Sequence, residues 1–156
     1  MRTRLAIGLV LGAVVVVAAA LVLRGGAPAP ARPSAAGADA AAGGIPWEHD
    51  LDAALRRAGA EKKMVMVDFY TDWCGWCRQL DRTTLADVKV RSALSGVVPV
   101  KLDAERGGHD AAARFAVDGY PTLVFLNASG AEIGRIPGYL EAGPFLEELG
   151  DISKHS

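Results

Sequence analysis

The hydrophobic pattern after residue 45 alternates between helical spacing and short apolar runs. Apolar residues at helical spacing predict helices over residues 51–58, from the cysteines to about residue 93, over 111–116 and from Pro144 onward. Short apolar runs predict strands over residues 64–69, 97–102, 120–126 and 132–136. Residues 64–69 are apolar almost throughout, which is typical of a central strand covered on both faces. Gly59 is expected to end the first helix, and Pro99 is expected to put the second strand at an edge or bend.

The predicted elements alternate between helices and strands, and the last two strands are consecutive. Strands that alternate with helices form parallel β-α-β units, whereas the turn at residues 127–130 joins the last two strands as an antiparallel hairpin. The sequence therefore predicts an α/β fold, with a mixed sheet of about four strands and helices on both faces.

The N-terminal segment, residues 1–23, follows a different pattern. Residues 5–23 form a run of 19 residues without a charged or polar side chain, preceded by Arg2 and Arg4. At about 1.5 Å per residue, a helix of this length nearly spans a hydrocarbon core of roughly 30 Å. We expect a signal anchor that exports the rest of the chain. The alternatives are a signal peptide cleaved within residues 27–38 and a buried soluble helix.

The remaining chain divides into a linker and one domain. Residues 24–44 are rich in Ala, Gly and Pro and contain no aromatic residue, which predicts a flexible linker. Residues 45–156 are long enough for one compact domain with its own core. This domain carries 13 Lys and Arg residues against 17 Asp and Glu residues, a net charge of −4. No basic patch predicts nucleic-acid binding.

Candidate chemistry is concentrated in a C-x-x-C pair, Cys74 and Cys77, between the first predicted strand and the second predicted helix. Helix geometry places the first sulfur at an exposed helix tip with backbone N–H groups pointing at it, and the second sulfur one turn further in. We therefore expect a redox-active pair in which Cys74 is the nucleophile and Cys77 resolves the mixed disulfide. A structural disulfide would close too short a loop to stabilise the fold much, and no histidine lies at the spacing of a metal ligand.

Three further residues stand out. Asp68 interrupts the buried strand, where an unpaired charge costs several kcal/mol, so we expect a raised pKa unless the carboxyl faces the surface. Trp73 and Trp76 flank the sulfurs and are expected to provide contact area for a polypeptide. For Trp73, packing beneath the active-site loop is the alternative.

Two segments of the chain resemble the thioredoxin superfamily: residues 67–77, Val-Asp-Phe-Tyr-Thr-Asp-Trp-Cys-Gly-Trp-Cys, and residues 119–125, Gly-Tyr-Pro-Thr-Leu-Val-Phe. The similarity covers about residues 45–149. It is closest to exported thioredoxin-like domains, such as the C-terminal domain of the DsbD-type membrane disulfide reductases. It implies the thioredoxin fold and thiol:disulfide exchange without a cofactor beyond the Cys74–Cys77 disulfide. Gly75-Trp76 replaces the usual Gly-Pro, which leaves the redox potential open.

The resemblance also implies roles for individual residues. Asp68 matches the buried acid that takes the proton of the second sulfur, and Lys101 matches a lysine that pairs with this acid, although a strand lysine is often only solvated. Pro121 matches a cis-proline that faces the cysteines and leaves the Tyr120 backbone free to pair with a substrate strand. The expected substrate-binding residues are Trp73, Gly75, Trp76, Tyr120 and Pro121.

The sequence thus predicts a protein-disulfide reductase that acts on protein or peptide disulfides, in cytochrome c maturation or disulfide repair. Because one span leaves no room for an electron relay, a separate DsbD- or CcdA-like membrane donor is expected. The expected location is the bacterial inner membrane with a periplasmic domain, or the periplasm or cell surface if the signal is cleaved. The alternatives are an oxidase or isomerase that uses the same site, and a non-catalytic binding or chaperone module.

Overall fold

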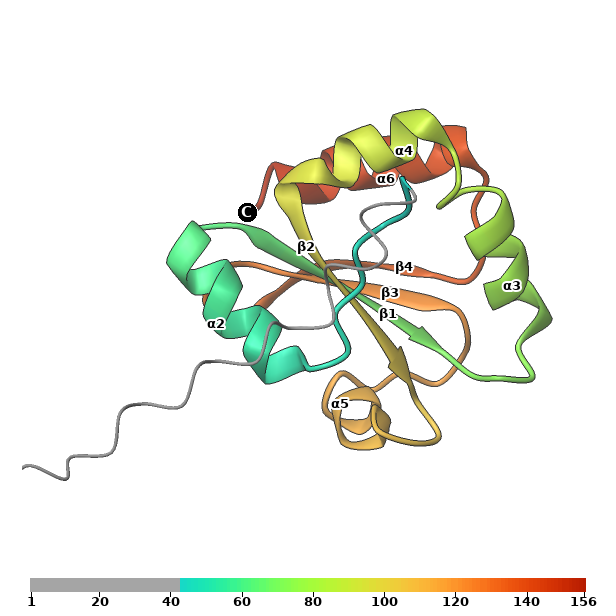
Figure 1. Ribbon diagram of the computed structural model, residues 1–156, viewed down its shortest axis with the longest axis horizontal. Coiled ribbons are helices and arrows are strands. Elements are labelled where there is room, and N and C mark those ends of the chain that lie inside the picture. The colour runs from blue at the N-terminus through green and yellow to red at the C-terminus, as the bar shows by residue number, and fades with distance from the viewer. Residues whose placement is uncertain (1–42) are drawn as a thin grey trace, which may run out of the picture. The chain divides into compact units, whose positions relative to one another are not determined.

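The computed structural model describes residues 43–156, shown in colour in Figure 1. The predicted signal anchor over residues 1–23, and all of the predicted linker except its last two residues, lie outside the described residues. Within residues 43–156, no helix combines the length and hydropathy that crossing a membrane requires.

The core of the described chain is a four-stranded mixed sheet with the order β2-β1-β3-β4. Its strands are β1 (Met64–Tyr70), β2 (Val97–Asp103), β3 (Thr122–Leu126) and β4 (Glu132–Pro137). β1 pairs in parallel with β2 and antiparallel with β3, and β3 and β4 form an antiparallel pair. The predicted sheet is confirmed, including the central position of β1 and the edge position of the Pro99 strand.

Helices cover both faces of this sheet (Figure 1). They are α2 (Leu51–Glu61), α3 (Gly75–Arg82), α4 (Val88–Ala93), α5 (His109–Arg114) and α6 (Ala142–Ser153), with a short 3-10 helix, η3 (Leu94–Gly96). One apolar cluster joins buried residues of α4, α6 and α3 to Met66. The other cluster joins α2 and α5 to Val65 and Val67. This division follows from the two-residue period of β1, which sends successive side chains to opposite faces.

Several predicted helix boundaries are wrong. The helix predicted over residues 111–116 is α5, which spans His109–Arg114. The helix after the cysteines is not continuous to residue 93, because α3 ends at Arg82 and the Asp87 carboxylate caps a new helix by accepting the N–H groups of Lys89 and Val90. The first helix passes Gly59 and ends at Glu61, and its C-cap Lys62 has a φ of 53°. An exposed helical glycine costs only about 1 kcal/mol relative to alanine, which neighbouring packing can offset.

The register of the sheet places the candidate residues. Asp68 on β1 is directly opposite Lys101 on β2. Both lie on the face covered by α3, because Asp68 shares the two-residue period of Met66, which packs in the cluster that contains Leu80 of α3. The cysteine segment follows the end of β1, and Pro121 directly precedes β3. The fold therefore brings the cysteine segment, the segment that contains Pro121 and the part of β2 that contains Lys101 to the same end of β1.

Candidate functional site

Cys74 and Cys77 form a disulfide at the start of α3. Cys74 is the N-cap of this helix, and its sulfur accepts the backbone N–H of Cys77 at 3.0 Å. A helix N-terminus carries a partial positive charge, and this N–H already points at the sulfur in the oxidised form. Both features stabilise a thiolate on Cys74 once the disulfide is reduced.

The prediction that the Cys74 sulfur lies at an exposed helix tip is wrong. Cys74 and Cys77 are each only 3% exposed. The Cys74 sulfur is bonded to Cys77, and the neighbouring side chains of Trp73 and Trp76 are 64% and 63% exposed. The large exposed side chains of this segment are therefore the tryptophans.

Trp73 is exposed and yet held in a fixed position. Its Nε1–H donates to the Glu105 carboxylate at 3.0 Å, and its ring packs edge-on against Tyr120 with 6.1 Å between centroids. These contacts come from two loops, one after β2 and one before β3. Because the ring is largely exposed, the alternative of packing beneath the active-site loop is wrong for Trp73.

Trp76 forms a second aromatic pair with Tyr139, which the sequence analysis did not single out. The two rings are stacked with 5.5 Å between centroids. The Tyr139 hydroxyl lies 3.3 Å from Thr83 Oγ1, and the N–H of Gly138 donates to the Pro121 carbonyl at 2.8 Å. An aromatic residue directly after Pro-Gly, in the loop between the hairpin and the last helix, was the available signal. The disulfide is thus flanked by one aromatic pair that contains Trp73 and one that contains Trp76.

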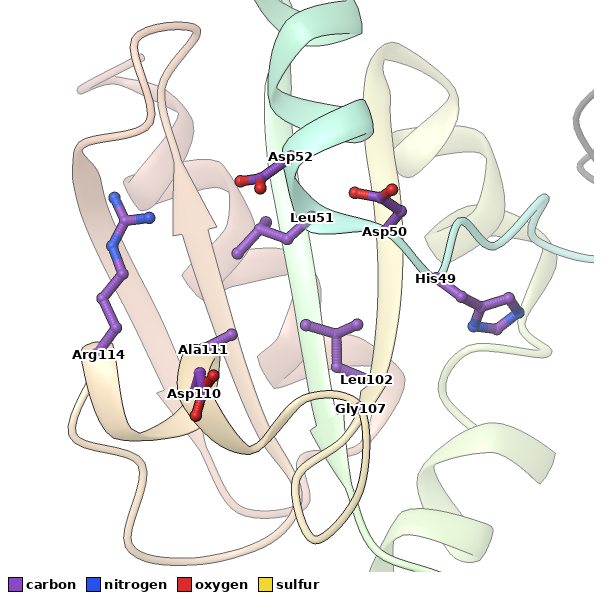
Figure 2. A pocket seen from close by; sticks show the side chains of 9 residues that line it. All are labelled: His49, Asp50, Leu51, Asp52, Leu102, Gly107, Asp110, Ala111 and Arg114. Carbon is purple, nitrogen blue, oxygen red and sulfur yellow. The ribbon is translucent and has the colours of Figure 1, made fainter.

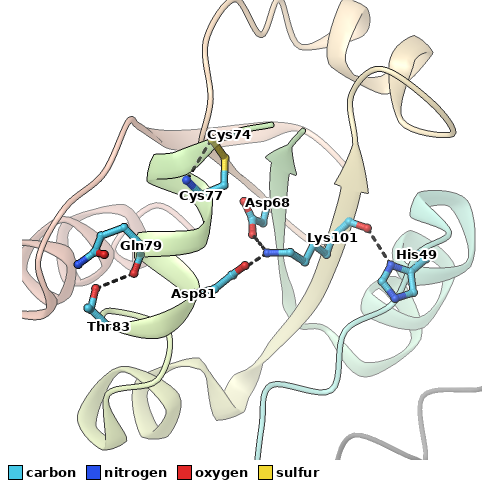
Figure 3. Close-up of polar contacts among 8 residues, drawn as sticks. All are labelled: His49, Asp68, Cys74, Cys77, Gln79, Asp81, Thr83 and Lys101. Atoms are coloured by element: carbon cyan, nitrogen blue, oxygen red, sulfur yellow. Dashed lines mark hydrogen bonds and ion pairs between the residues drawn. A yellow bond between two sulfur atoms is a disulfide. The ribbon is translucent and has the colours of Figure 1, made fainter. Parts of the chain in front are cut away.

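Asp68 is buried and paired with Lys101. Its side chain is 1% exposed, and Lys101 Nζ donates to Asp68 Oδ2 at 2.5 Å (Figure 3). Burial raises the pKa of the Asp68 carboxyl, and the positive charge of Lys101 offsets this only in part. The other oxygen, Oδ1, is buried and accepts no hydrogen bond from the described protein. The alternative of a surface-facing acid is therefore wrong.

Lys101 is itself surrounded by groups that the sequence analysis did not connect with it. Its Nζ also donates to the Asp81 carboxylate at 2.7 Å, and lies 5.0 Å from the Trp47 ring centroid and 5.1 Å from that of Tyr70. Burial works to lower the pKa of Lys101, but the two carboxylates outweigh it and the pKa is raised. Asp81 is four residues after Cys77, a spacing that puts both on one helix face and could have indicated this contact.

Tyr120 and Pro121 directly precede β3. The Tyr120–Pro121 peptide bond is cis. Within residues 43–156, the backbone N–H and C=O of Tyr120 have no hydrogen-bond partner. Gly75 is exposed between the sulfurs and has no close contact that would exclude a side chain. An extended polypeptide could therefore pair with Tyr120 beside the disulfide.

A separate hollow of about 430 Å³ lies at the start of α2 and along α5 (Figure 2). The carboxylates of Asp50, Asp52 and Asp110 and the guanidinium of Arg114 line it, but none of the site residues does. Asp50 caps α2 by accepting the N–H of Ala53, which explains its presence. Among the described residues, no group of His, Cys, Asp and Glu side chains could hold a metal ion. We therefore place the chemistry at the disulfide and not in this hollow.

Comparison with known proteins agrees with this geometry. The family model of the Thioredoxin-like domain matches residues 51–153. A Thiol:disulfide interchange protein DsbD of Ralstonia nicotianae is 35% identical over 92% of this chain and 26% of its own length. A DsbD of Cronobacter sakazakii is 38% identical over 64% of this chain and 18% of its own length. The chain thus spans about a quarter or less of these relatives.

Solved structures show the same fold. A thioredoxin from Thermus thermophilus is 33% identical and superposes with a TM-score of 0.61. The match covers 67% of this chain and 85% of that protein. The predicted thioredoxin fold is therefore confirmed, and the predicted resemblance to DsbD-type proteins is confirmed by the sequence relatives.

Replacing Asp68 by asparagine should change how stability depends on pH. Between the ordinary pKa of 3.8 and the raised pKa of folded Asp68, the folded protein keeps a proton that the unfolded chain has lost. The free energy of unfolding of the parent protein should therefore fall as pH rises through this window, and Asp68→Asn should remove that fall. Urea unfolding of the oxidised proteins at a series of pH values measures the difference. Asp118→Asn, on an exposed loop, is the control, and equal pH slopes for parent and Asp68→Asn would contradict the expectation.

Proposed function

Because the chain belongs to the thioredoxin-like family, we propose that its Cys74–Cys77 pair exchanges electrons with disulfides in proteins and peptides, acting as a reductase. The observation that carries this proposal is the disulfide at the N-terminus of α3, on the face of the sheet where Asp68 is buried.

The arrangement supports a two-step exchange. The Cys74 thiolate attacks one sulfur of a substrate disulfide, and the other substrate sulfur leaves as a thiolate. Cys77 then gives its thiol proton to Asp68 and attacks the Cys74 sulfur, which breaks the mixed disulfide and releases the second substrate sulfur. Two electrons pass to the substrate, and the protein is left with the Cys74–Cys77 disulfide. A raised pKa suits Asp68 to this role, because it makes the carboxylate a better proton acceptor than an ordinary one.

The surface around the disulfide supports a polypeptide substrate. The backbone of Tyr120 is free to form strand-like hydrogen bonds, and the rings of Trp73 and Trp76 offer apolar area on either side. Their partners Tyr120 and Tyr139 hold these rings in place, so little side-chain entropy is lost on binding. Exposed aromatic residues of this kind dominate the affinity of many protein interfaces.

The proposed location is outside the cytoplasmic membrane, with residues 5–23 as anchor or signal. This rests on the apolar run and on the sequence similarity to DsbD proteins. A reductase in an oxidising compartment needs a supply of electrons. We assign that supply to a separate membrane protein of the DsbD or CcdA type, and apocytochrome c or misformed protein disulfides are the proposed substrates.

Replacing Cys77 by serine should trap the first covalent complex. Cys74 can still attack, but the serine hydroxyl cannot resolve the mixed disulfide, so a complex with insulin should accumulate and disappear when dithiothreitol is added. Non-reducing electrophoresis measures the complex. Cys74→Ser should form none. Trapping by Cys74→Ser and not by Cys77→Ser would reverse the two roles, and trapping by neither would argue for the binding-module alternative.

The redox potential of the pair should distinguish a reductase from an oxidase. Titration of the Cys74–Cys77 disulfide against glutathione should give a value near that of thioredoxin, about −270 mV. The fraction of alkylated cysteine at each ratio of reduced to oxidised glutathione measures it. A potential near −120 mV, close to that of DsbA, would instead assign the site to disulfide formation.

Removing the Trp76 ring should weaken the binding of protein substrates and leave the reaction with a small disulfide nearly unchanged. Trp76→Ala deletes the apolar wall stacked on Tyr139, so the KM for insulin should rise roughly tenfold, whereas reaction with hydroxyethyl disulfide should change little. Steady-state kinetics with both substrates measure this. Val88→Ala is the matched control, because Val88 is 71% exposed on α4 and does not adjoin the disulfide in sequence. Equal effects on both substrates would show that Trp76 acts on the sulfurs and not on docking.

A further inference from the structure

A cavity of about 430 Å³ opens beside the buried ion pair. It is lined by Lys101 and Asp81, by the Trp47 ring, by Ala86 after α3 and by Arg91 of α4. None of the residues expected to bind substrate lines it. Solvent can therefore reach Lys101 from a side that the aromatic pairs around the disulfide do not cover.

Lys101 connects this cavity to Asp68. Its Nζ donates to Asp68 Oδ2 at 2.5 Å and to Asp81 Oδ1 at 2.7 Å. The Asp81 side chain is 41% exposed, the Lys101 side chain 14% and the Asp68 side chain 1%. The three groups thus form a continuous series of hydrogen-bonded polar atoms that leads from solvent to the interior.

The disulfide side offers Asp68 poor access to solvent. Both cysteines are 3% exposed in the free protein, and a polypeptide docked on Trp73 and Trp76 would cover this side further. Burial raises the pKa of Asp68, and a carboxyl that is already protonated must lose its proton before it can accept that of Cys77. A site that works against a docked protein therefore benefits from a second route for that proton.

We propose that the cavity beside Lys101 and Asp81 is the route by which Asp68 exchanges protons with solvent while a polypeptide covers the disulfide. This inference rests on the proposed thiol:disulfide exchange. Asp81 is the outer proton acceptor, and Lys101 is the connecting group. Neither touches the substrate, so both are positioning and relay residues.

The proton balance of the relay is simple. In one concerted transfer, the ammonium of Lys101 gives a proton to the Asp81 carboxylate while it accepts the proton of the Asp68 carboxyl, which leaves Asp68 able to take the proton of Cys77. Asp81 then loses its proton to solvent in the cavity. Lys101 ends as the ammonium and Asp68 as the carboxylate, while one proton has left the interior and no electron has moved.

The electrostatic surroundings keep Lys101 in its charged form before and after the transfer. Burial opposes charge on both Asp68 and Lys101, but the carboxylates of Asp68 and Asp81 raise the pKa of Lys101 on balance. The groups that face Lys101 are Asp68 and the Tyr70 ring from β1, Asp81 from α3 and the Trp47 ring. Arg91 is the further charged group on the cavity wall.

Chemical rescue can test the relay. The reduced full-length chain in detergent is mixed with excess insulin in weak buffer, and alkylation after an acid quench measures the rate at which the Cys74–Cys77 disulfide forms. Asp81→Ala should slow this rate roughly tenfold, and added formate should restore it, because formate can enter the cavity and accept the proton. Asp81→Glu should retain most of the rate.

Two tryptophan substitutions test the cavity itself without changing a charged group. Ala86→Trp should obstruct the cavity, slow the reaction with insulin and abolish the formate rescue when combined with Asp81→Ala. Ala60→Trp, on an exposed position of α2 outside this cavity, should react as fast as the parent protein. With hydroxyethyl disulfide, which leaves the disulfide side open to water, the defect of Asp81→Ala should be smaller.

The outcomes separate this inference from the proposed function. If the parent protein does not react with insulin, the proposed function fails. If the parent reacts but Asp81→Ala is equally fast, or is slow and unaffected by formate, the relay is wrong and Asp81 only holds Lys101 in place. An equal defect with insulin and hydroxyethyl disulfide would also overturn the route, because it would show that covering the disulfide makes no difference.

Discussion

The site depends on a carboxyl group buried in the central strand of the sheet. Asp68 is flanked on both sides by hydrogen-bonded strands, so it cannot move to solvent without opening the core. Burying an unpaired carboxylate costs several kcal/mol, and Lys101, directly opposite on β2, reduces this cost without removing it. The part of the burial cost that Lys101 does not offset raises the pKa of Asp68. A residue that is unfavourable for folding thereby becomes a better proton acceptor than an ordinary carboxylate.

Helix α3 connects this buried charge to the sulfur chemistry. Its first turn holds the disulfide, and Asp81 in its last turn accepts a hydrogen bond from Lys101. The helix therefore carries the disulfide at one end and is joined to β2 at the other end through the ion pair between Asp81 and Lys101.

Much of this fold could be predicted from the sequence, and the exceptions have physical causes. The continuous apolarity of residues 64–69 identified the central strand, and the two motifs identified the cysteine segment and Pro121. The break between α3 and α4 was missed because buried Leu85 keeps a helical apolar spacing through the turn. Contacts such as Trp76 with Tyr139 join segments far apart in the chain, and no local pattern records them.

The direction of electron flow is not set by Asp68. A carboxyl whose pKa lies closer to neutrality can accept a proton from Cys77 or return one, so it accelerates both directions equally. Direction depends on how strongly the reduced form is stabilised relative to the disulfide, which in this fold means the Cys74 thiolate. Its stabilising groups are the N-terminus of α3 and the N–H of Cys77, and both are backbone features. Gly75 and Trp76 shape that turn of backbone, so they adjust the potential through geometry rather than through charge.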